Sequence, residues 1–499
     1  MGWMLGVQNA VSTIRQRILS VLRFQPAGAF SVTIYEPYSY AANVARNRIW
    51  YRGEPSELFQ FYKSNGASST GDSVNRSRFW AAVPSRGMQI RKIHTGLPAL
   101  CVDKLADIVV TDMQSVVFSG PDAEKTQTRW NRIAAENDLT ELVRRAVVET
   151  DVTGDGAFKI SFDTSISPLP LLEFYSGEQV AYTTVRGRIT EITFYTPKEL
   201  DGQCYQLAET YASGSVRYAL CDRLGRPADL SLFDDLTNLS SVSWAEPVLW
   251  AVPLAFAHSP TFTGRGRSLF DGKCDVFDAL DEDISQWTDA VRAGRASRYI
   301  PIDLIPRDTM TGAPMEPNPF DNQFIAVRGA LAEAQNGQVQ VVQPDIRSDA
   351  YQQKYTADLD IALMGVLSPS TLGIGLSKKD NAEAQREKEK ATLYSRAKRV
   401  AALERVLPKL AQATLAAEDI LSGRPVGDYP CTISWGEYAN PSFESVAATV
   451  GQARQNGIMS IEQAVRELYG DTMSAPEKQV EVARIKMEQG LFPGNEQPA

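Results

Sequence analysis

Two long helical patterns on either side of a short mixed segment constrain this chain more than any other feature. From Ser268 to Ser297, apolar residues recur at alternating spacings of three and four, which is typical of a helical seam. The seam residues are Phe277, Leu280, Ile284, Trp287 and Val291. A helix of this length is a rod of roughly 45 Å. Because a rod with one apolar stripe is unstable alone in water, a partner must cover the stripe.

A second helix of the same kind is predicted at residues 346–367, where the apolar stripe includes Tyr355, Leu359 and Leu363. The segment between the two helices, residues 298–345, contains short runs typical of strands. Two helices that bracket such an insert predict a hairpin that projects from the body of the protein. We expect the same helices of neighbouring copies to cover it, since head-to-tail copies can close into a ring.

The longest helix is predicted at residues 381–421, after a loop at residues 368–380 that contains Pro and Gly. A helix of this length spans roughly 60 Å. Pro408 should kink it, because proline lacks the N–H of a helical residue and clashes with the preceding turn. The predicted buried face consists of Leu393, Val400, Leu403, Leu407 and Leu410.

The remaining segments predict a mixed body. Residues 1–44 are predicted to form an amphipathic helix and an arm. Residues 45–267 combine helices with antiparallel strands at 157–256, where apolar and polar residues alternate. A strand is predicted within residues 422–440 and three short helices within residues 441–499. We therefore expect a fold of the α+β class.

Composition limits the class of protein. The chain has 499 residues, of which 43% are apolar and 22% charged, as in a soluble globular protein. Its net charge of −9 argues against a generic nucleic-acid binder, although a channel through which DNA slides should also avoid many phosphate contacts. The five cysteines include no CxxC pair, so they indicate neither a zinc cluster nor a disulfide framework and fit a reducing cytoplasm. No apolar run reaches the ~18 residues needed to cross a bilayer.

The sequence offers little that could carry catalysis. His94 and His258 are its only histidines, and it contains neither a GxSxG nor a GxxxxGK[ST] motif. We therefore expect no enzyme, no cofactor and no metal. Residues 151–156 (DVTGDG) resemble a calcium loop, but Thr occupies the third position and no Glu the twelfth. A glycine turn before a strand is the favoured interpretation of this motif, with calcium binding as the alternative.

Several phrases of the sequence resemble, in the same order, those of portal proteins from tailed bacteriophages. The phrases are Arg48–Tyr62 (RIWYRGEPSELFQFY), Thr153–Lys159 (TGDGAFK), Arg265–Phe270 (RGRSLF) followed by Ala279–Asp281 (ALD), and Leu367–Gly373 (LSPSTLG) followed by Ala382–Glu387 (AEAQRE). The order of predicted elements also resembles the portal-protein fold. The resemblance covers most of residues 45–490.

In the portal fold that the resemblance implies, the segments correspond to a wing (45–267), a first stem helix (268–297), a clip (298–345), a second stem helix (346–367), a tunnel loop (368–380), a spine helix (381–421), a wing return strand (422–440) and crown helices with a tail (441–499). The implied function is that of a ring subunit at one capsid vertex, through which the terminase packages DNA and through which DNA exits. The resemblance implies twelve copies per ring. The implied partners are double-stranded DNA, the terminase large subunit, the major capsid and scaffold proteins and a tail adaptor, with no membrane. The implied location is the virion, after assembly in the host cytoplasm.

The resemblance also implies site residues in the tunnel loop. They are Ile374 and Leu376 as an apolar collar, Lys378 and Lys379 as a weak electrostatic brake on phosphates, and Ser377 between them. The alternative interpretation is a solvated loop before a helix.

Other interpretations stay open at this point. The acidic run Asp278–Asp283 could line the channel and repel DNA, or it could form the wet side of its helix. The whole chain could instead be another ring-forming structural protein of a virion, or a soluble enzyme that uses carboxylates. An enzyme should turn over substrate as a monomer, whereas a portal protein should show no turnover and should sediment as a large ring.

Overall fold

The computed structural model describes residues 39–66, 78–83, 90–237, 239–295, 297–301, 304–315, 324–327, 340–343, 345–374, 382–436, 443–469, 473 and 475–489. The amphipathic helix predicted at the start of the chain lies outside these residues. The chain divides into two units, Met1–Asn43 and Val44–Ala499. The described residues are 48% helical and 21% strand, which confirms the α+β class.

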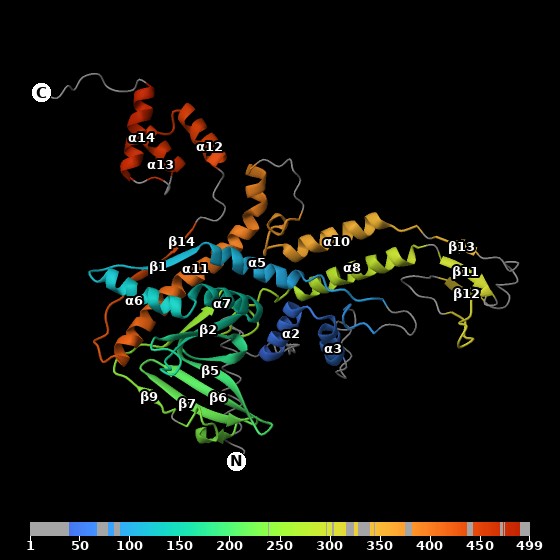
Figure 1. Cartoon of the computed structure of the whole chain (residues 1–499), viewed down its shortest axis with the longest axis horizontal. Coiled ribbons are helices and arrows are strands. Elements are labelled where there is room, and N and C mark those ends of the chain that lie inside the picture. The colour runs from blue at the N-terminus through green and yellow to red at the C-terminus, as the bar shows by residue number, and fades with distance from the viewer. Residues whose placement is uncertain are drawn as a thin grey trace, which may run out of the picture. The chain divides into compact units, whose positions relative to one another are not determined.

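Helices dominate the first part of the described chain (Figure 1). They are α2 (Tyr40–Arg52), α3 (Pro55–Gly66), α5 (Leu97–Thr111), α6 (Ala123–Glu136) and α7 (Leu139–Thr153). Gly96, with φ of 71°, and Pro98 in the first turn set the start of α5, because proline is tolerated where no helical N–H bond is needed. The helical part predicted within residues 45–267 is thus confirmed.

The strands that follow are antiparallel, as predicted for residues 157–256. Strand β2 (Asp155–Ser161) lies between β10 (Ala251–Ala255) and β3 (Leu171–Ser176), and its first six residues are buried. In the described chain, a larger sheet has the order β4-β5-β6-β7-β8, with β9 also paired to β7. Its strands are β4 (Val180–Val185), β5 (Arg188–Leu200), β6 (Gln203–Ala212), β7 (Ser215–Asp222), β8 (Pro227–Ala228) and β9 (Val242–Ser243). Strand β1 (Met113–Phe118) pairs with β14 (Cys431–Trp435), which confirms a strand within residues 422–440.

The predicted hairpin is present, but its helices are shorter than predicted. Helix α8 spans Cys274–Ala293 rather than 268–297, and α10 spans Ser348–Leu363 rather than 346–367. Ser268 and Asp271 have the spacing of a capping box, and the Asp271 carboxylate accepts the Ser268 N–H at 3.0 Å, but α8 begins only at Cys274. The Ser268 hydroxyl donates instead to the carbonyls of Asp151 and Val152 at 3.0 and 2.8 Å.

The insert between the two helices contains a small sheet in which β11 (Ser297–Pro301) pairs in parallel with β12 (Phe324–Val327) and antiparallel with β13 (Gln340–Val342). The strands predicted within residues 298–345 are thus confirmed, with β11 ending at Pro301.

Helix α11 (Ala382–Leu421) is 40 residues long and contains Pro408, as predicted. Val400, Leu403, Leu407 and Leu410 are buried, but Leu393 is 36% exposed, so its assignment to the buried face is wrong. The three predicted terminal helices are α12 (Phe443–Gln455), α13 (Ile461–Tyr469) and α14 (Ala475–Glu488).

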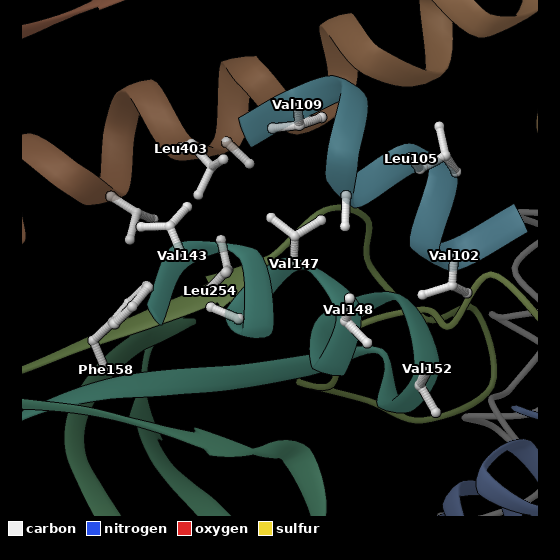
Figure 2. Packing of buried hydrophobic residues seen from close by; sticks show 14 of the residues in the cluster. Val102, Leu105, Val109, Val143, Val147, Val148, Val152, Phe158, Leu254 and Leu403 are labelled. Atoms are coloured by element: carbon white, nitrogen blue, oxygen red, sulfur yellow. The ribbon is translucent and has the colours of Figure 1, made fainter. Parts of the chain in front are cut away.

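One continuous core joins helices and strands that are far apart in the sequence. Val102, Leu105 and Val109 from α5 converge with side chains of α7, of β2 and β10, and of α11 (Figure 2). The other labelled side chains are Val143, Val147, Val148 and Val152 of α7, Phe158 of β2, Leu254 of β10 and Leu403 of α11. The core therefore fixes α11 against the body along its C-terminal half.

Gly154 and Gly266 allow two segments of the backbone to cross in close contact shortly before α8 begins. A Cβ on Gly266 would lie 2.0 Å from the carbonyl oxygen of Gly154, and a Cβ on Gly154 would lie 2.6 Å from the carbonyl oxygen of Gly266. Asp155 fastens the crossing, since its carboxylate accepts the Gly266 N–H at 2.6 Å and pairs with Arg265 at 2.8 Å. Both phrases of the sequence that contain these glycines therefore form one structural node.

We expect Gly266→Ala to lower the free energy of unfolding by about 3 kcal/mol, because a methyl group cannot fit against the Gly154 backbone. Urea unfolding of the full chain measures the change. Gly451→Ala is the matched control, since nothing lies within 4 Å of a Cβ there and the residue is in α12. The control should be neutral or stabilised by up to about 1 kcal/mol, and equal effects of the two substitutions would contradict the crossing.

Candidate functional site

The candidate site is the antiparallel pair of helices α8 and α10, which lie side by side (Figure 1). At the start of α8, the Lys273 ammonium group donates to the carbonyls of Ile361 and Met364 at the end of α10, at 2.8 and 2.9 Å. A cation there satisfies carbonyl groups that the helix itself leaves unpaired. Near the end of α8, a Cβ on Gly294 would lie 2.3 Å from the Ile346 side chain, so Gly294 allows a close approach.

A buried charge joins the middle of the two helices. Lys354 of α10 pairs with Asp283 of α8 and, at 2.8 Å, with Asp358 on its own helix. The Asp283 side chain is only 4% exposed, whereas Lys354 is 56% exposed. Burial raises the pKa of Asp283, and the hydrogen bond from Lys354 opposes that rise. Lys354 therefore offsets part of the cost of burying the Asp283 carboxylate.

The apolar seam predicted for α8 is covered at one end and open at the other. Phe277 and Leu280 are buried, Ile284 and Trp287 are half-buried, and Val291 is 47% exposed. On α10, Leu359 and Leu363 are buried and Tyr355 is half-buried. Of these residues, Phe277, Leu280, Leu359 and Leu363 belong to the main core. A single copy of the chain thus leaves the C-terminal half of the α8 seam partly in water.

A groove of about 500 Å³ lies where α8 ends and α10 begins. Ala290, Ala293 and Gly294 line one side of it, and Ile346, Ala350, Tyr351 and Lys354 line the other, together with Asp345 and Arg347. All three residues on the α8 side of the groove are small.

Both interpretations of the acidic run are wrong for three of its members. Asp278, Asp281 and Asp283 are at most 6% exposed, so they neither face a channel nor form the wet side of α8. Buried carboxylates persist only when donors surround them, and these three accept hydrogen bonds from protein groups. Asp278 and Asp281 are three positions apart and each directly follows a residue of the apolar stripe, which is the signal that could have predicted their burial.

The calcium-like motif at residues 151–156 and His94 both have interaction partners within the protein. Asp151 pairs with Arg399 at 2.6 Å and Asp155 with Arg265 at 2.8 Å, so the carboxylates of the calcium-like motif already have protein partners. His94 Nδ1 lies 2.7 Å from Asp281, beside Trp50. Across the described residues, no group of three or more His, Cys, Asp or Glu side chains could hold a metal ion.

Most of the predicted tunnel-loop site lies outside the described residues, namely Leu376, Ser377, Lys378 and Lys379. The described part ends at Ile374, which is 37% exposed and follows a short 3-10 helix, Pro369–Leu372. Thr392 of α11 holds the start of this loop, because its hydroxyl accepts the Ser368 N–H at 2.9 Å and lies 2.7 Å from Thr371 Oγ1.

We expect Lys354→Met to destabilise the chain by about 1 kcal/mol at pH 7.5, since it leaves Asp283 ionised, buried and without its cation. Burial without Lys354 raises the pKa of Asp283 further, so the folded state binds a proton more readily than the unfolded state. The loss should therefore shrink as the pH falls to 4.5. Urea unfolding at the two pH values measures it, with Lys125→Met, an 86% exposed lysine, as the control. A loss that is equal at both pH values would contradict this role.

No protein-family profile matches the sequence. No curated protein sequence matches it either. Among the described residues, no helix has the length and apolarity that a membrane crossing requires.

Solved structures with some likeness come from gene transfer agent particles. A chain from the neck of a native particle, computed with twelvefold symmetry, is 13% identical with a TM-score of 0.36, over 79% of this chain and 91% of that one. A chain from the virion of the native particle is 14% identical with a TM-score of 0.36, over 78% and 89%. A chain from the neck of the empty particle, computed with sixfold symmetry, is 14% identical with a TM-score of 0.36, over 81% and 95%. TM-scores this low assign neither a family nor a function.

Proposed function

We propose that this chain is the subunit of a phage-type portal ring. Copies would close around a channel at one capsid vertex, through which DNA enters during packaging and later leaves. The observation that carries the proposal is the α8 seam, which is buried at Leu280 and 47% exposed at Val291 in a single copy. A neighbouring copy would cover the exposed end.

The order of elements along the chain supports the same function. A mixed body leads into α8, a small three-stranded insert, α10, a Gly-Pro loop and the 40-residue helix α11. In this proposal they are the wing, stem, clip, tunnel loop and spine that the resemblance of the sequence implies. In this proposal the ring has twelve copies, and the tunnel loop with Lys378 and Lys379 borders the DNA.

The proposed partners follow from the same function. The terminase, the tail adaptor, the capsid protein and the scaffold would contact the ring from outside, and DNA would pass inside. A net charge of −9 suits a passage that must not hold DNA tightly, because each neutralised phosphate adds affinity. The chain itself would catalyse no reaction and would reside in the virion.

The acidic residues of α8 do not support the carboxylate-enzyme alternative. Asp278, Asp281 and Asp283 are the buried acids of α8, and each accepts hydrogen bonds from protein donors rather than facing a pocket. Another ring-forming structural protein of a virion is separated from a portal protein by the DNA experiment described below.

Val291→Asp should abolish the large assembly, because it places a charge on the exposed end of the seam without disturbing the buried end. Sedimentation velocity of the purified chain measures the assembly. Gln286→Glu, at an exposed position of the same helix, adds an equal charge and should leave the ring intact. A ring of unchanged size in Val291→Asp would contradict the proposed interface.

Replacing Lys378 and Lys379 together by Ala should change DNA packaging or retention while ring assembly stays normal, because lysines close to DNA add phosphate affinity. The measurements are the DNA content of assembled particles and, for the ring, sedimentation velocity. Unchanged packaging and retention in the double variant would contradict a position of this loop at the channel.

A further inference from the structure

Helix α8 binds a second structure besides α10. Residues 78–83 and 90–95, which lie between α3 and α5 in the sequence, pack on its N-terminal half and are called the strap here. Phe79 and Trp80 of the strap are buried, Trp80 completely. The strap therefore contributes to the core while remaining outside regular secondary structure.

Side chains of α8 hold the backbone of the strap. The Asp278 carboxylate accepts the N–H groups of Phe79 and Trp80 at 2.7 and 3.1 Å. The Asp281 carboxylate accepts the Trp80 indole N–H at 3.0 Å and the Thr95 N–H at 2.9 Å. Two carboxylates one helical turn apart thus fasten both pieces of the strap.

Lys92 binds backbone carbonyl groups of the same turn. Its ammonium group donates to the carbonyls of Phe79, Trp80 and Ala82 at 2.5, 3.2 and 2.9 Å, and it lies 4.8 Å from the centre of the Phe79 ring. In this turn, the N–H groups of Phe79 and Trp80 thus bind an anion of α8, and the carbonyls of Phe79, Trp80 and Ala82 bind a cation of the strap. Because these bonds are made by charged side chains, they respond to protonation.

Burial disfavours the ionised form of Asp278. Its carboxylate is 6% exposed, and both of its hydrogen bonds described above come from neutral backbone N–H groups. Burial raises its pKa to about 6, although the two N–H groups and Arg78 lower it and Asp281 raises it further. Lys92 also faces Asp278. The neighbouring Asp281 carboxylate lies 2.7 Å from the His94 ring.

We propose that attachment of the strap to α8 is proton-linked, with Asp278 taking up a proton when the strap is attached and releasing it when the strap detaches. The inference goes beyond the proposed function and does not depend on it. Detachment exposes Asp278 to water, where an ionised carboxylate is favoured, and uncovers Trp80. Attachment buries the group again and favours its neutral form.

The direction of the effect follows from linkage. The attached state binds a proton more tightly than the detached state, so attachment strengthens as the pH falls and reaches its weakest level above pH 6. With an ordinary carboxyl pKa near 4 for the detached strap, the opening equilibrium should fall about tenfold from pH 8 to pH 5. The strap is thus held less tightly at neutral pH than in mild acid.

Hydrogen exchange of the full chain tests this proposal. Exchange at the Phe79 and Trp80 amides, corrected for the intrinsic rate at each pH, should report an opening constant about ten times larger at pH 8 than at pH 5. Asp278→Asn should remove this dependence. Asp289→Asn, at an exposed position near the other end of the same helix, should preserve it. An opening constant without pH dependence in the unmodified chain, or an unchanged dependence in Asp278→Asn, would overturn the proposal.

A second variant keeps the test valid if Asp278→Asn fails to fold. Lys92→Met removes a cation that faces Asp278, so the midpoint of the pH dependence should move to higher pH. The midpoint is read from the same two amides. A midpoint that stays in place or moves to lower pH would contradict Asp278 as the titrating group.

Discussion

The close backbone crossing of Gly154 and Gly266 is the constraint on which the rest of the structure depends. It joins the end of α7 and the start of β2 to the segment that leads into α8. Asp155 accepts the Gly266 N–H, and the Ser268 hydroxyl donates to the carbonyls of Asp151 and Val152 across the same junction. This junction sets the position of α8 and therefore the place where the hairpin begins. Neither glycine could be replaced by a larger residue without moving the backbone.

Buried charges then specify how the remaining elements meet. Arg399 of α11 makes two hydrogen bonds with Asp151 of α7, at 2.8 and 2.6 Å, so the longest helix is fixed to the crossing itself. Lys159 of β2 pairs with Glu209 of the larger sheet at 3.1 Å and thereby connects the two sheets. Such pairs add little net stability, but each penalises any arrangement in which one partner is left alone in the interior. They therefore select one arrangement among several that the apolar residues alone would allow.

Periodicity predicted the helices well, because a buried stripe such as Leu403 and Leu407 must repeat with the helix itself. It failed at helix ends, where a single hydrogen bond can decide at which residue the helix begins. Ser268 has the spacing of a capping residue but bonds to α7, a contact across 117 positions of sequence that no local pattern contains. It also failed for Asp278 and Asp281, since acids are expected on a wet face and only the strap backbone makes their burial tolerable. Of the candidate site, the hairpin and its seam were predictable, whereas Lys273 and Lys354, which hold its helices together, were not.

One copy of the hairpin is therefore well fixed to its body and incompletely covered along α8. Its seam passes from the core at Leu280 to water at Val291, and a groove of about 500 Å³ lies beside that open end. We propose that further copies complete this surface and close into a ring. Electron microscopy of the purified, unmodified chain tests this claim most directly: the account predicts top views with a central hole wide enough for a DNA duplex. A population of single, separate molecules at every protein concentration would contradict it.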